Sequence, residues 1–130
     1  MDEKHTEQLD WTLNGAGVSV IDAQTSNGAI LVNGSDESQV VIQAFKEVKA
    51  RTQADAEAFA RQVEVFVEQN GNEVKIFKEH PKPPKHIQVS VRYEIQSPAG
   101  VNVNLRTSNG KIQIHGINGT IEAKTSNGAI

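Results

Sequence analysis

The chain has 130 residues, the size of one ordinary domain, which argues against two independent cores. Its formal net charge is −3, with 13 Lys and Arg against 16 Asp and Glu, so it lacks the general basic charge of a nucleic-acid-binding protein. It has no cysteine, which excludes disulfides, thiolate metal ligands and a cysteine nucleophile, and no apolar run of about 18 residues that would predict a membrane span.

The first predicted strand lies near residue 21, in a segment that occurs twice. The ten residues from Ile21 match the ten residues from Ile121 at all but two positions. The positions that differ pair Asp22 with Glu122 and Gln24 with Lys124. Both are polar and alternate with Ile and Ala, which predicts a strand with one solvent face and one buried face. The same local structure is expected twice.

The middle of the chain departs from this pattern. Residues 39–48 are β-branched and partly alternating, which predicts a strand. Thr52 and Asp55 resemble a capping box and precede an Ala-rich stretch, which predicts one short helix at about 53–62.

Two further β elements follow the predicted helix. Residues 63–78 are two apolar runs around Asn70-Gly71, a pattern that predicts a β-hairpin. After a proline-rich loop at residues 80–86, the alternation of Ile, Val and Tyr over residues 87–95 predicts another strand.

The last 30 residues carry a short repeat. An x-Asn-Gly-x-Ile unit occurs at 108–112, 117–121 and 126–130, nine residues apart. The fuller Thr-Ser-Asn-Gly begins at Thr107 and again at Thr125, eighteen residues apart. A fixed short period indicates a repeat architecture, and we interpret the longer period as one structural turn made of two nine-residue arms. Asn-Gly supplies the bend of each arm, because Gly and Asn tolerate the backbone angles of tight turns.

The repeat also predicts which side chains share a face. Two rows are expected to point inward, namely Val103, Ile112, Ile121 and Ile130, and Leu105, Ile114 and Ala123. The residues between them are expected to face water, namely Asn102, Asn104, Lys111, Gln113, His115, Thr120, Glu122 and Lys124.

Two architectures fit this pattern. One is a β-solenoid, in which each arm stacks on the arm one coil away, and the other is an antiparallel meander with Asn-Gly hairpins. The eighteen-residue identity favours the solenoid, because stacked coils place Thr107 over Thr125 and Asn109 over Asn127. The predicted fold is mainly β: a single-stranded parallel β-solenoid with an inserted β-hairpin and one short α-helix, as one domain over 1–130. Because the repeat stops directly after its motif at Ile130, we expect a truncated C-terminus or an open end closed by another subunit.

The Ser-Asn-Gly segments that begin at Ser26, Ser108 and Ser126 resemble those of the bacterial putative-adhesin family, a group of β-solenoid domains rich in such repeats. The Ala-rich helix and the hairpin before the repeats are also similar. The resemblance implies a right-handed parallel β-solenoid, typically in a cell-envelope protein, with no catalytic residues to transfer. It suggests an extracytoplasmic location, although the chain shows no signal peptide.

No metal or cofactor site is assigned. His80 and His86 flank three prolines without clustered partner ligands, so a solvated loop is expected there, and its Lys82 and Lys85 could favour an anionic partner. The segment Gly15-Ala16-Gly17 lacks the Lys of a phosphate loop and is expected to be a turn.

Other short motifs are expected to be structural. Asn33-Gly34-Ser35 and Asn118-Gly119-Thr120 match the N-glycosylation pattern, but each Asn-Gly is expected to make a bend. A row of Thr hydroxyls could bind ice or glycan. Alternation places Thr125 inward, where its hydroxyl is expected to bond a backbone group, and the same holds for Thr25 and Thr107.

These patterns predict a non-catalytic structural or interaction protein of adhesin-like type, with no catalytic residue assigned. The expected partner is a second copy of the protein or another protein at the open solenoid end, or else a glycan. Neither nucleic-acid binding nor a membrane span is expected. The alternative is a carbohydrate-binding or carbohydrate-cleaving module. For such a module Asp22, Glu122, Arg106 and Lys124 could line an outward face.

Overall fold

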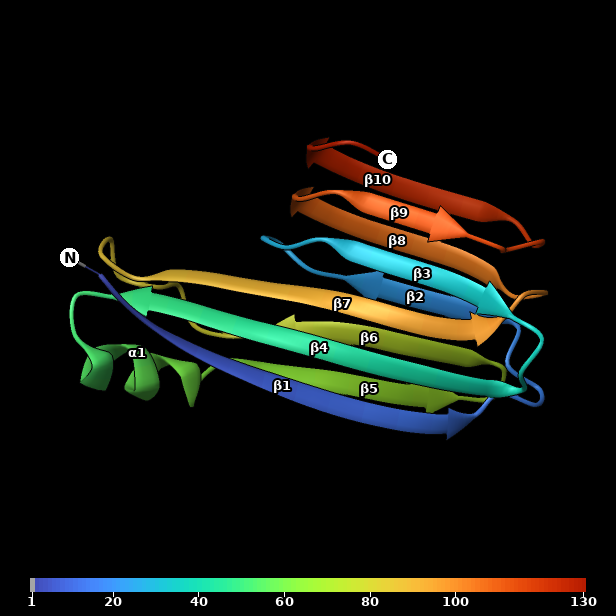
Figure 1. Cartoon of the computed structure of the whole chain (residues 1–130), viewed down its shortest axis with the longest axis horizontal. Helices are drawn as coiled ribbons and strands as arrows, with labels where there is room; N and C mark the ends of the chain where they lie inside the picture. The colour runs from blue at the N-terminus through green and yellow to red at the C-terminus, as the bar shows by residue number, and fades with distance from the viewer. Residues whose placement is uncertain (1) are drawn as a thin grey trace.

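The structure, a computed structural model, describes residues 2–130, which form ten β-strands and one α-helix (Figure 1). In chain order the elements are β1 (Glu3–Asn14), β2 (Val20–Gln24), β3 (Ile30–Ser35), β4 (Gln39–Ala50), α1 (Gln53–Ala60), β5 (Glu64–Asn70), β6 (Glu73–Glu79), β7 (Gln88–Pro98), β8 (Asn102–Asn109), β9 (Ile112–His115) and β10 (Ile121–Asn127).

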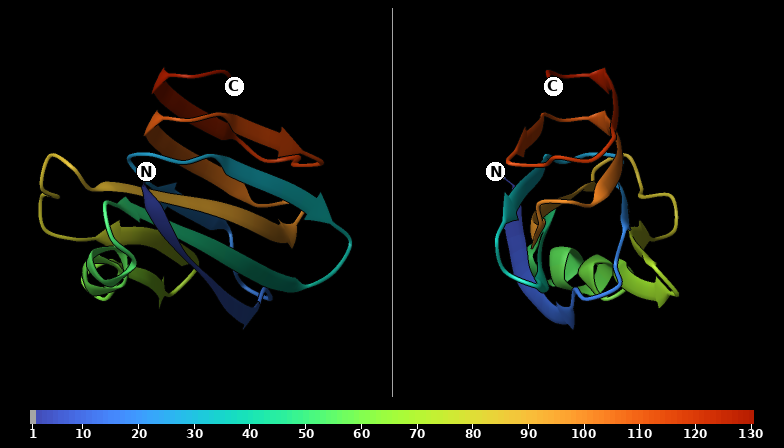
Figure 2. Two further views of the ribbon diagram at one scale, coloured as in Figure 1. Left: turned by 60° about the vertical axis from the view of Figure 1, so that its left-hand side comes forward. Right: turned by 90° about the vertical axis from the view of Figure 1, so that its right-hand side faces the viewer.

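The strands form two five-stranded sheets that enclose a mainly aliphatic core (Figure 2). Sheet A has the order β1-β4-β7-β3-β9, and sheet B has the order β10-β8-β2-β6-β5. Both sheets are mixed: β3 pairs in parallel with β7 and β9, and β8 with β2 and β10, whereas β4 pairs antiparallel with β1 and β7, and β5 with β6. The mainly β fold with one short helix is confirmed. In place of the predicted single-stranded parallel solenoid, the structure shows two mixed sheets.

The antiparallel pairs arise where the repeat is missing from the sequence. Between β3 and β8, the one Asn-Gly is Asn70-Gly71, at the tight turn of the β5–β6 hairpin, where Gly71 has a φ of 60°. Without a corner every nine residues, the chain does not cross to the other sheet after a short arm. It instead forms strands of 12 and 11 residues, β4 and β7, that pair antiparallel with each other within sheet A.

The strands of the repeat pair as the eighteen-residue period requires. β8 and β10 are parallel, with Val103 opposite Ile121 and Thr107 opposite Thr125. The Asn109-Gly110 corner leads from β8 in sheet B to β9 in sheet A, so it is not a hairpin between neighbouring strands. The meander alternative is therefore wrong for this part of the chain.

Each Thr-Ser-Asn-Gly corner contacts one backbone carbonyl group of the neighbouring level, meaning the next corner or strand in the stack. The Thr107 hydroxyl donates to the Gly28 carbonyl at 3.0 Å, and a Cβ at Gly110 would collide with that same oxygen. Thr125 and Gly128 have the same relation to the carbonyl of Gly110, as Thr25 and Gly28 have to that of Val91. The expectation that these hydroxyls bond the backbone is confirmed.

The Asn side chains of the corners form a second ladder. Asn127 Nδ2 donates to Asn109 Oδ1 at 2.8 Å, and Asn109 Nδ2 donates to Asn27 Oδ1 at 2.7 Å. Asn27 completes the ladder by donating to the Val89 carbonyl at 3.3 Å. Each level thus specifies the position of the next through both side-chain and backbone contacts.

The inward rows of the repeat are confirmed only in part. Val103, Leu105 and Ile112 are buried, and Ile114 and Ala123 are partly buried. Ile121 and Ile130, predicted to point inward, are 46% and 68% exposed. β10 is an edge strand that pairs with β8 alone, so fewer neighbours cover it. The side chains predicted to face water are all exposed or half-buried.

The predicted helix and hairpin are present with slightly shifted ends. Thr52 caps α1 by accepting a bond from the Asp55 amide at 3.1 Å. Asn33-Gly34, predicted to bend, lies inside β3, where a Cβ at Gly34 would collide with the Gly116 carbonyl. Strand β1 was not predicted from the sequence, because its charged outer residues hide the inward alternation of Leu9, Trp11 and Leu13.

Replacing Thr107 by Val tests the corner contact. This isosteric change removes the hydroxyl that donates to the Gly28 carbonyl, so we expect the free energy of unfolding to fall by about 1 kcal/mol, measured by urea denaturation. The control is Thr12→Val, at an exposed position of β1, which should stay within about 0.5 kcal/mol of the parent. Equal effects of the two substitutions would contradict the role of the corner hydroxyl.

Candidate interaction surface

The outer face of sheet B carries polar side chains in two rows that run across the strands. The first row is set by the pairing of Glu68 with Lys75, Lys75 with Asp22, Asp22 with Asn104, and Asn104 with Glu122. It therefore crosses all five strands, from β5 to β10. Because alternate residues of a strand share a face, this register gathers polar groups from distant parts of the sequence.

The second row joins two aromatic rings to polar groups. Phe66 and Phe77 lie opposite each other on β5 and β6, and their rings stack with centroids 5.1 Å apart. On the other strands of the sheet, Gln24 pairs with Arg106, and Arg106 pairs with Lys124. The rings are half-buried, whereas the three polar side chains are exposed. The face therefore changes from apolar to polar along this row.

A groove of about 480 Å³ lies on this face, between the aromatic ring of Phe77 and the polar side chains of β2 and β8. Its lining includes Phe77, Asp22, Gln24 and Arg106. Among residues 2–130, no hydrogen bond or ion pair engages the side chains of Asp22, Gln24 or Arg106. A carboxylate accepts, a guanidinium donates and an amide does both, so the groove offers unused donors and acceptors beside an aromatic ring. Its volume is within the usual range of ligand sites.

The structure brings together the four residues considered for a carbohydrate-cleaving module. Asp22, Arg106, Glu122 and Lys124 all lie on the outer face of sheet B, as predicted from the alternation. Asn104 lies between Asp22 and Glu122 in the first row, so these two carboxylates are not adjacent. The contribution of the hairpin, that of Phe77 above all, was not predicted from the sequence. The polar and apolar alternation of residues 73–79 was the available signal, but it does not say beside which strand the hairpin packs.

His80, the first histidine of the loop after β6, is held by polar contacts and by one aromatic contact. Lys78 Nζ lies 2.6 Å from His80 Nε2, and His80 Nδ1 lies 2.8 Å from the Pro81 carbonyl. The His80 ring also makes an edge contact with Phe59 of α1. Burial lowers the pKa of Lys78. His86 is exposed, as are Lys82 and Lys85, so the structure does not bring the two histidines of this loop to a common site.

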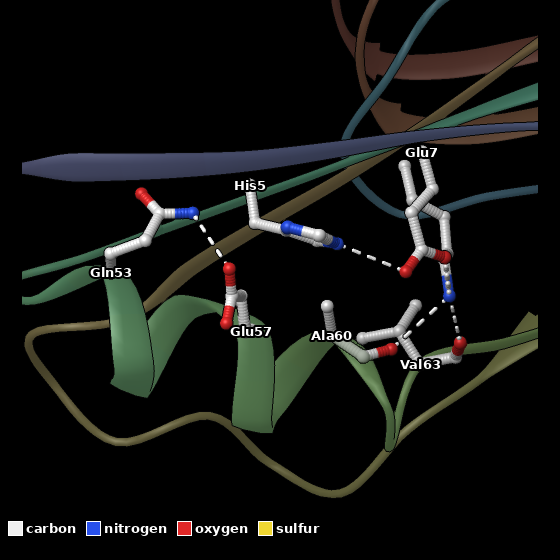
Figure 3. A network of polar contacts seen from close by, with 7 residues as sticks. His5, Glu7, Gln53, Glu57, Ala60 and Val63 are labelled. Atoms are coloured by element: carbon white, nitrogen blue, oxygen red, sulfur yellow. Dashed lines mark hydrogen bonds and ion pairs between the residues drawn. The ribbon is translucent and has the colours of Figure 1, made fainter.

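The buried charge among residues 2–130 is that of Lys46, between β4 and α1. The Lys46 ammonium donates to the carbonyls of Ala60 and Val63 at 3.1 and 2.8 Å, and pairs with Glu7 at 2.8 Å. Figure 3 shows these carbonyls close to Glu7, which also contacts His5. The contacts satisfy all three donors of Lys46, so we interpret the cluster as a structural support for the end of α1.

Glu7 titrates below the usual range because of this cluster. Its hydrogen bonds to Lys46 and then to His5 lower the pKa from the ordinary value of 4.5, and burial opposes them. A lowered folded-state pKa means that ionised Glu7 stabilises the fold above about pH 4.5. That stabilisation is lost as the pH falls through the folded-state value.

Residues 2–130 contain no group of three or more His, Asp or Glu side chains arranged to hold a metal ion. The helix that the structure describes in these residues is neither long nor apolar enough to cross a membrane.

Three crystal structures of other proteins match this chain over most of its length. A putative cell adhesion protein from Clostridium sporogenes has a TM-score of 0.54 and 10% identity, over 95% of this chain and 59% of that protein. A putative adhesin from Bacteroides fragilis has a TM-score of 0.45, with 17% identity over 94% of this chain and 51% of that one. A putative lipid binding protein from Parabacteroides distasonis has a TM-score of 0.35, with 11% identity over 89% and 51%.

The chain thus spans about half to three fifths of the lengths of these three proteins. No protein-family model matches the chain, and no curated protein sequence matches it. The similarity to the Clostridium protein shows a shared β architecture, because its TM-score exceeds 0.5.

Replacing Glu7 by Gln tests the buried cluster. We expect the parent protein to lose stability as the pH falls from neutral to below about 4.5, and Glu7→Gln to show a smaller loss over that range. At neutral pH the variant should be less stable by roughly 1–2 kcal/mol, below the cost for a fully buried pair because the Glu7 side chain is 36% exposed.

The measurement is urea denaturation at a series of pH values. The control, Glu64→Gln, removes an exposed carboxylate of β5 and should stay within about 0.5 kcal/mol of the parent at neutral pH. A pH dependence that is the same with and without the Glu7 carboxylate would contradict its role.

Proposed function

We propose that the chain is a non-catalytic, adhesin-like interaction module, and that the outer face of sheet B binds an uncharged oligosaccharide. The observation that carries the proposal is the groove beside Phe77, where Asp22, Gln24 and Arg106 have no partner within residues 2–130. Sugar hydroxyls both donate and accept hydrogen bonds, and planar polar side chains of these types can bind pairs of them.

The aromatic ring and the charge balance favour an uncharged sugar. The C–H face of a sugar ring is apolar, and the half-buried ring of Phe77 offers an apolar surface against which it can pack. The two rows contain the carboxylates of Glu68, Asp22 and Glu122 and the cations of Lys75, Arg106 and Lys124. These charges balance, so the face has no net attraction for an acidic polymer.

The proposed absence of catalysis has two supports. Asp22 and Glu122 are two strand spacings apart, about 9–10 Å, which is wider than the roughly 5.5 Å between the carboxyl groups of a retaining glycosidase and at the upper limit of the roughly 6.5–9.5 Å of an inverting one. The exposed Glu122 side chain is not among the residues that line the groove, so the two carboxylates do not face a common site there.

We further propose that β2, β3, β8, β9 and β10 are the arms of a short β-solenoid. Strands β1 and β4 and the β5–β6 hairpin are additions to it. The parallel register and the corners that pass between the sheets support this assignment. The adhesin names of the Clostridium and Bacteroides proteins are consistent with a binding role, and those proteins are longer than this chain.

A glycan array followed by calorimetric titration of the strongest neutral oligosaccharide tests the binding proposal. We expect neutral glycans to be retained in preference to acidic ones. Phe77→Ala and Arg106→Ala should each weaken binding roughly tenfold, equivalent to about 1.4 kcal/mol, because each removes one side of the groove.

Lys111→Ala is the matched control for Arg106→Ala. It also removes one exposed positive charge, at a position outside the groove, and should bind like the parent protein. If no neutral glycan binds, or if the control weakens binding as much as Arg106→Ala, the proposal is wrong.

The proposed lack of catalysis is tested separately with a reducing-sugar assay. The protein is incubated with each polysaccharide that carries the bound oligosaccharide, and we expect no release of reducing ends above the uncatalysed rate. Release that disappears in Asp22→Asn or Glu122→Gln would identify these carboxylates as catalytic and overturn the proposal.

A further inference from the structure

Lys78 carries an amine at one end of the core without a carboxylate partner. It lies two residues after the buried Ile76 of β6, so alternation places it on the same inner face of sheet B. It lines a hollow of about 470 Å³, whose apolar lining comes from Pro83, Ile87 and Val89. Among residues 2–130, Lys78 forms no ion pair. Burial lowers the pKa of Lys78, so a larger share of this residue is the unprotonated, nucleophilic amine at neutral pH.

His80 is placed to accept a proton from this amine. Its Nδ1 lies 2.8 Å from the Pro81 carbonyl, and because a carbonyl only accepts, Nδ1 carries a hydrogen. In the neutral ring the free lone pair is then on Nε2, which lies 2.6 Å from Lys78 Nζ. An amine, a base within hydrogen-bond reach and a third group that orients the base are the parts of an activated nucleophile.

Two other lysines lack this arrangement. Lys46 is buried, but its three donors are used by two carbonyls and a carboxylate. Lys75 lies on the same strand as Lys78, is more exposed and pairs with Glu73 at 3.7 Å. Lys75 is therefore a matched comparison for Lys78, because reactivity set by exposure alone would favour Lys75.

We propose that Lys78 is a covalent attachment site for a short aliphatic aldehyde, with His80 as the proton acceptor. The nitrogen lone pair forms a C–N bond to the carbonyl carbon as the C–O π bond breaks. His80 Nε2 takes the proton released by the nitrogen and gives it to the alkoxide oxygen. The nitrogen then expels this oxygen with a second proton from solvent and loses its own remaining proton to solvent, so the products are an imine and one water molecule.

The hollow suits the chain of such an aldehyde. Pro83, Ile87 and Val89 offer apolar surface beside the amine, where an aliphatic chain is removed from water. The attachment is a single event without turnover, so it is independent of both the glycan proposal and the proposed lack of catalysis.

Labelling of the unaltered protein with pentanal and cyanoborohydride tests the proposal. Cyanoborohydride delivers hydride to the imine carbon and so converts each imine into a stable secondary amine. Peptide mass spectrometry then gives the initial rate at each lysine. We expect Lys78 to react roughly tenfold faster than Lys75 at neutral pH, although Lys75 is more exposed.

The pH dependence of labelling identifies the group that controls the rate. The other charged side chains that line the hollows on this side of Lys78 are Glu47, Lys49, Glu64 and Glu79. Such carboxylates stay ionised from about pH 6 to 9, and an ordinary lysine stays charged there. We expect labelling of Lys78 to reach half its maximal rate at a lower pH than labelling of Lys75.

Two substitutions of His80 separate proton transfer from support of the loop. His80→Ala and His80→Gln should each slow labelling of Lys78 roughly tenfold or more, because glutamine can accept a hydrogen bond but cannot take up the proton. His86→Ala is the matched control, since it removes an exposed histidine of the same loop, and it should label like the parent. Folding of each variant is checked by circular dichroism.

Three results would overturn the proposal. One is a Lys78 rate in the parent no higher than that of Lys75, a comparison that needs no variant. Another is a His80→Gln variant that labels as fast as the parent, which would limit His80 to holding the loop. The third is an equal loss of rate in the His86→Ala control.

Discussion

The contact that governs this structure is the close approach of each Thr-Ser-Asn-Gly corner to a single carbonyl group of the level beside it. The Gly28 carbonyl accepts the Thr107 hydroxyl and leaves no room for a Cβ at Gly110. One oxygen therefore fixes two residue types three positions apart. A larger residue in place of the glycine would separate the levels, and a residue without a hydroxyl in place of the threonine would leave the carbonyl with one partner fewer.

This constraint also determines what the outer face of sheet B presents. Because the corners hold neighbouring levels in register, Asp22, Asn104 and Glu122 align across three strands, although more than eighty residues separate the first two. The level next to β2 is formed by the hairpin, and it adds Lys75 and Phe77 to the same face. The proposed groove thus lies where repeat-derived and inserted strands meet, so its chemistry requires both parts of the chain.

The sequence predicted the parts of the fold that depend on local chemistry. The cap at Thr52, the hairpin around Gly71 and the register of Thr107 with Thr125 follow from turn residues and from a fixed period, and they are present. It did not predict the pairing partners of β1, β4 and β7, because alternation defines a buried face but not a neighbour. The same limit applies to the groove: Asp22 and Arg106 were recognised as outward-facing, whereas the approach of Phe77 depends on long-range packing.

The contact at Val91 shows that the threonine and the glycine are needed only in the corner, and not in the strand that supplies the carbonyl. Its carbonyl accepts the Thr25 hydroxyl at 2.7 Å and abuts Gly28, yet β7 has no Asn-Gly of its own at this point. A carbonyl is available from any residue, so a strand without the repeat, such as β7, can serve as the base on which the first corner rests. The threonine and the glycine are required of the corner that is added, not of the strand that receives it. This asymmetry explains how a repeat of a few levels can be joined to sheet A, whose longest strands carry no repeat at all.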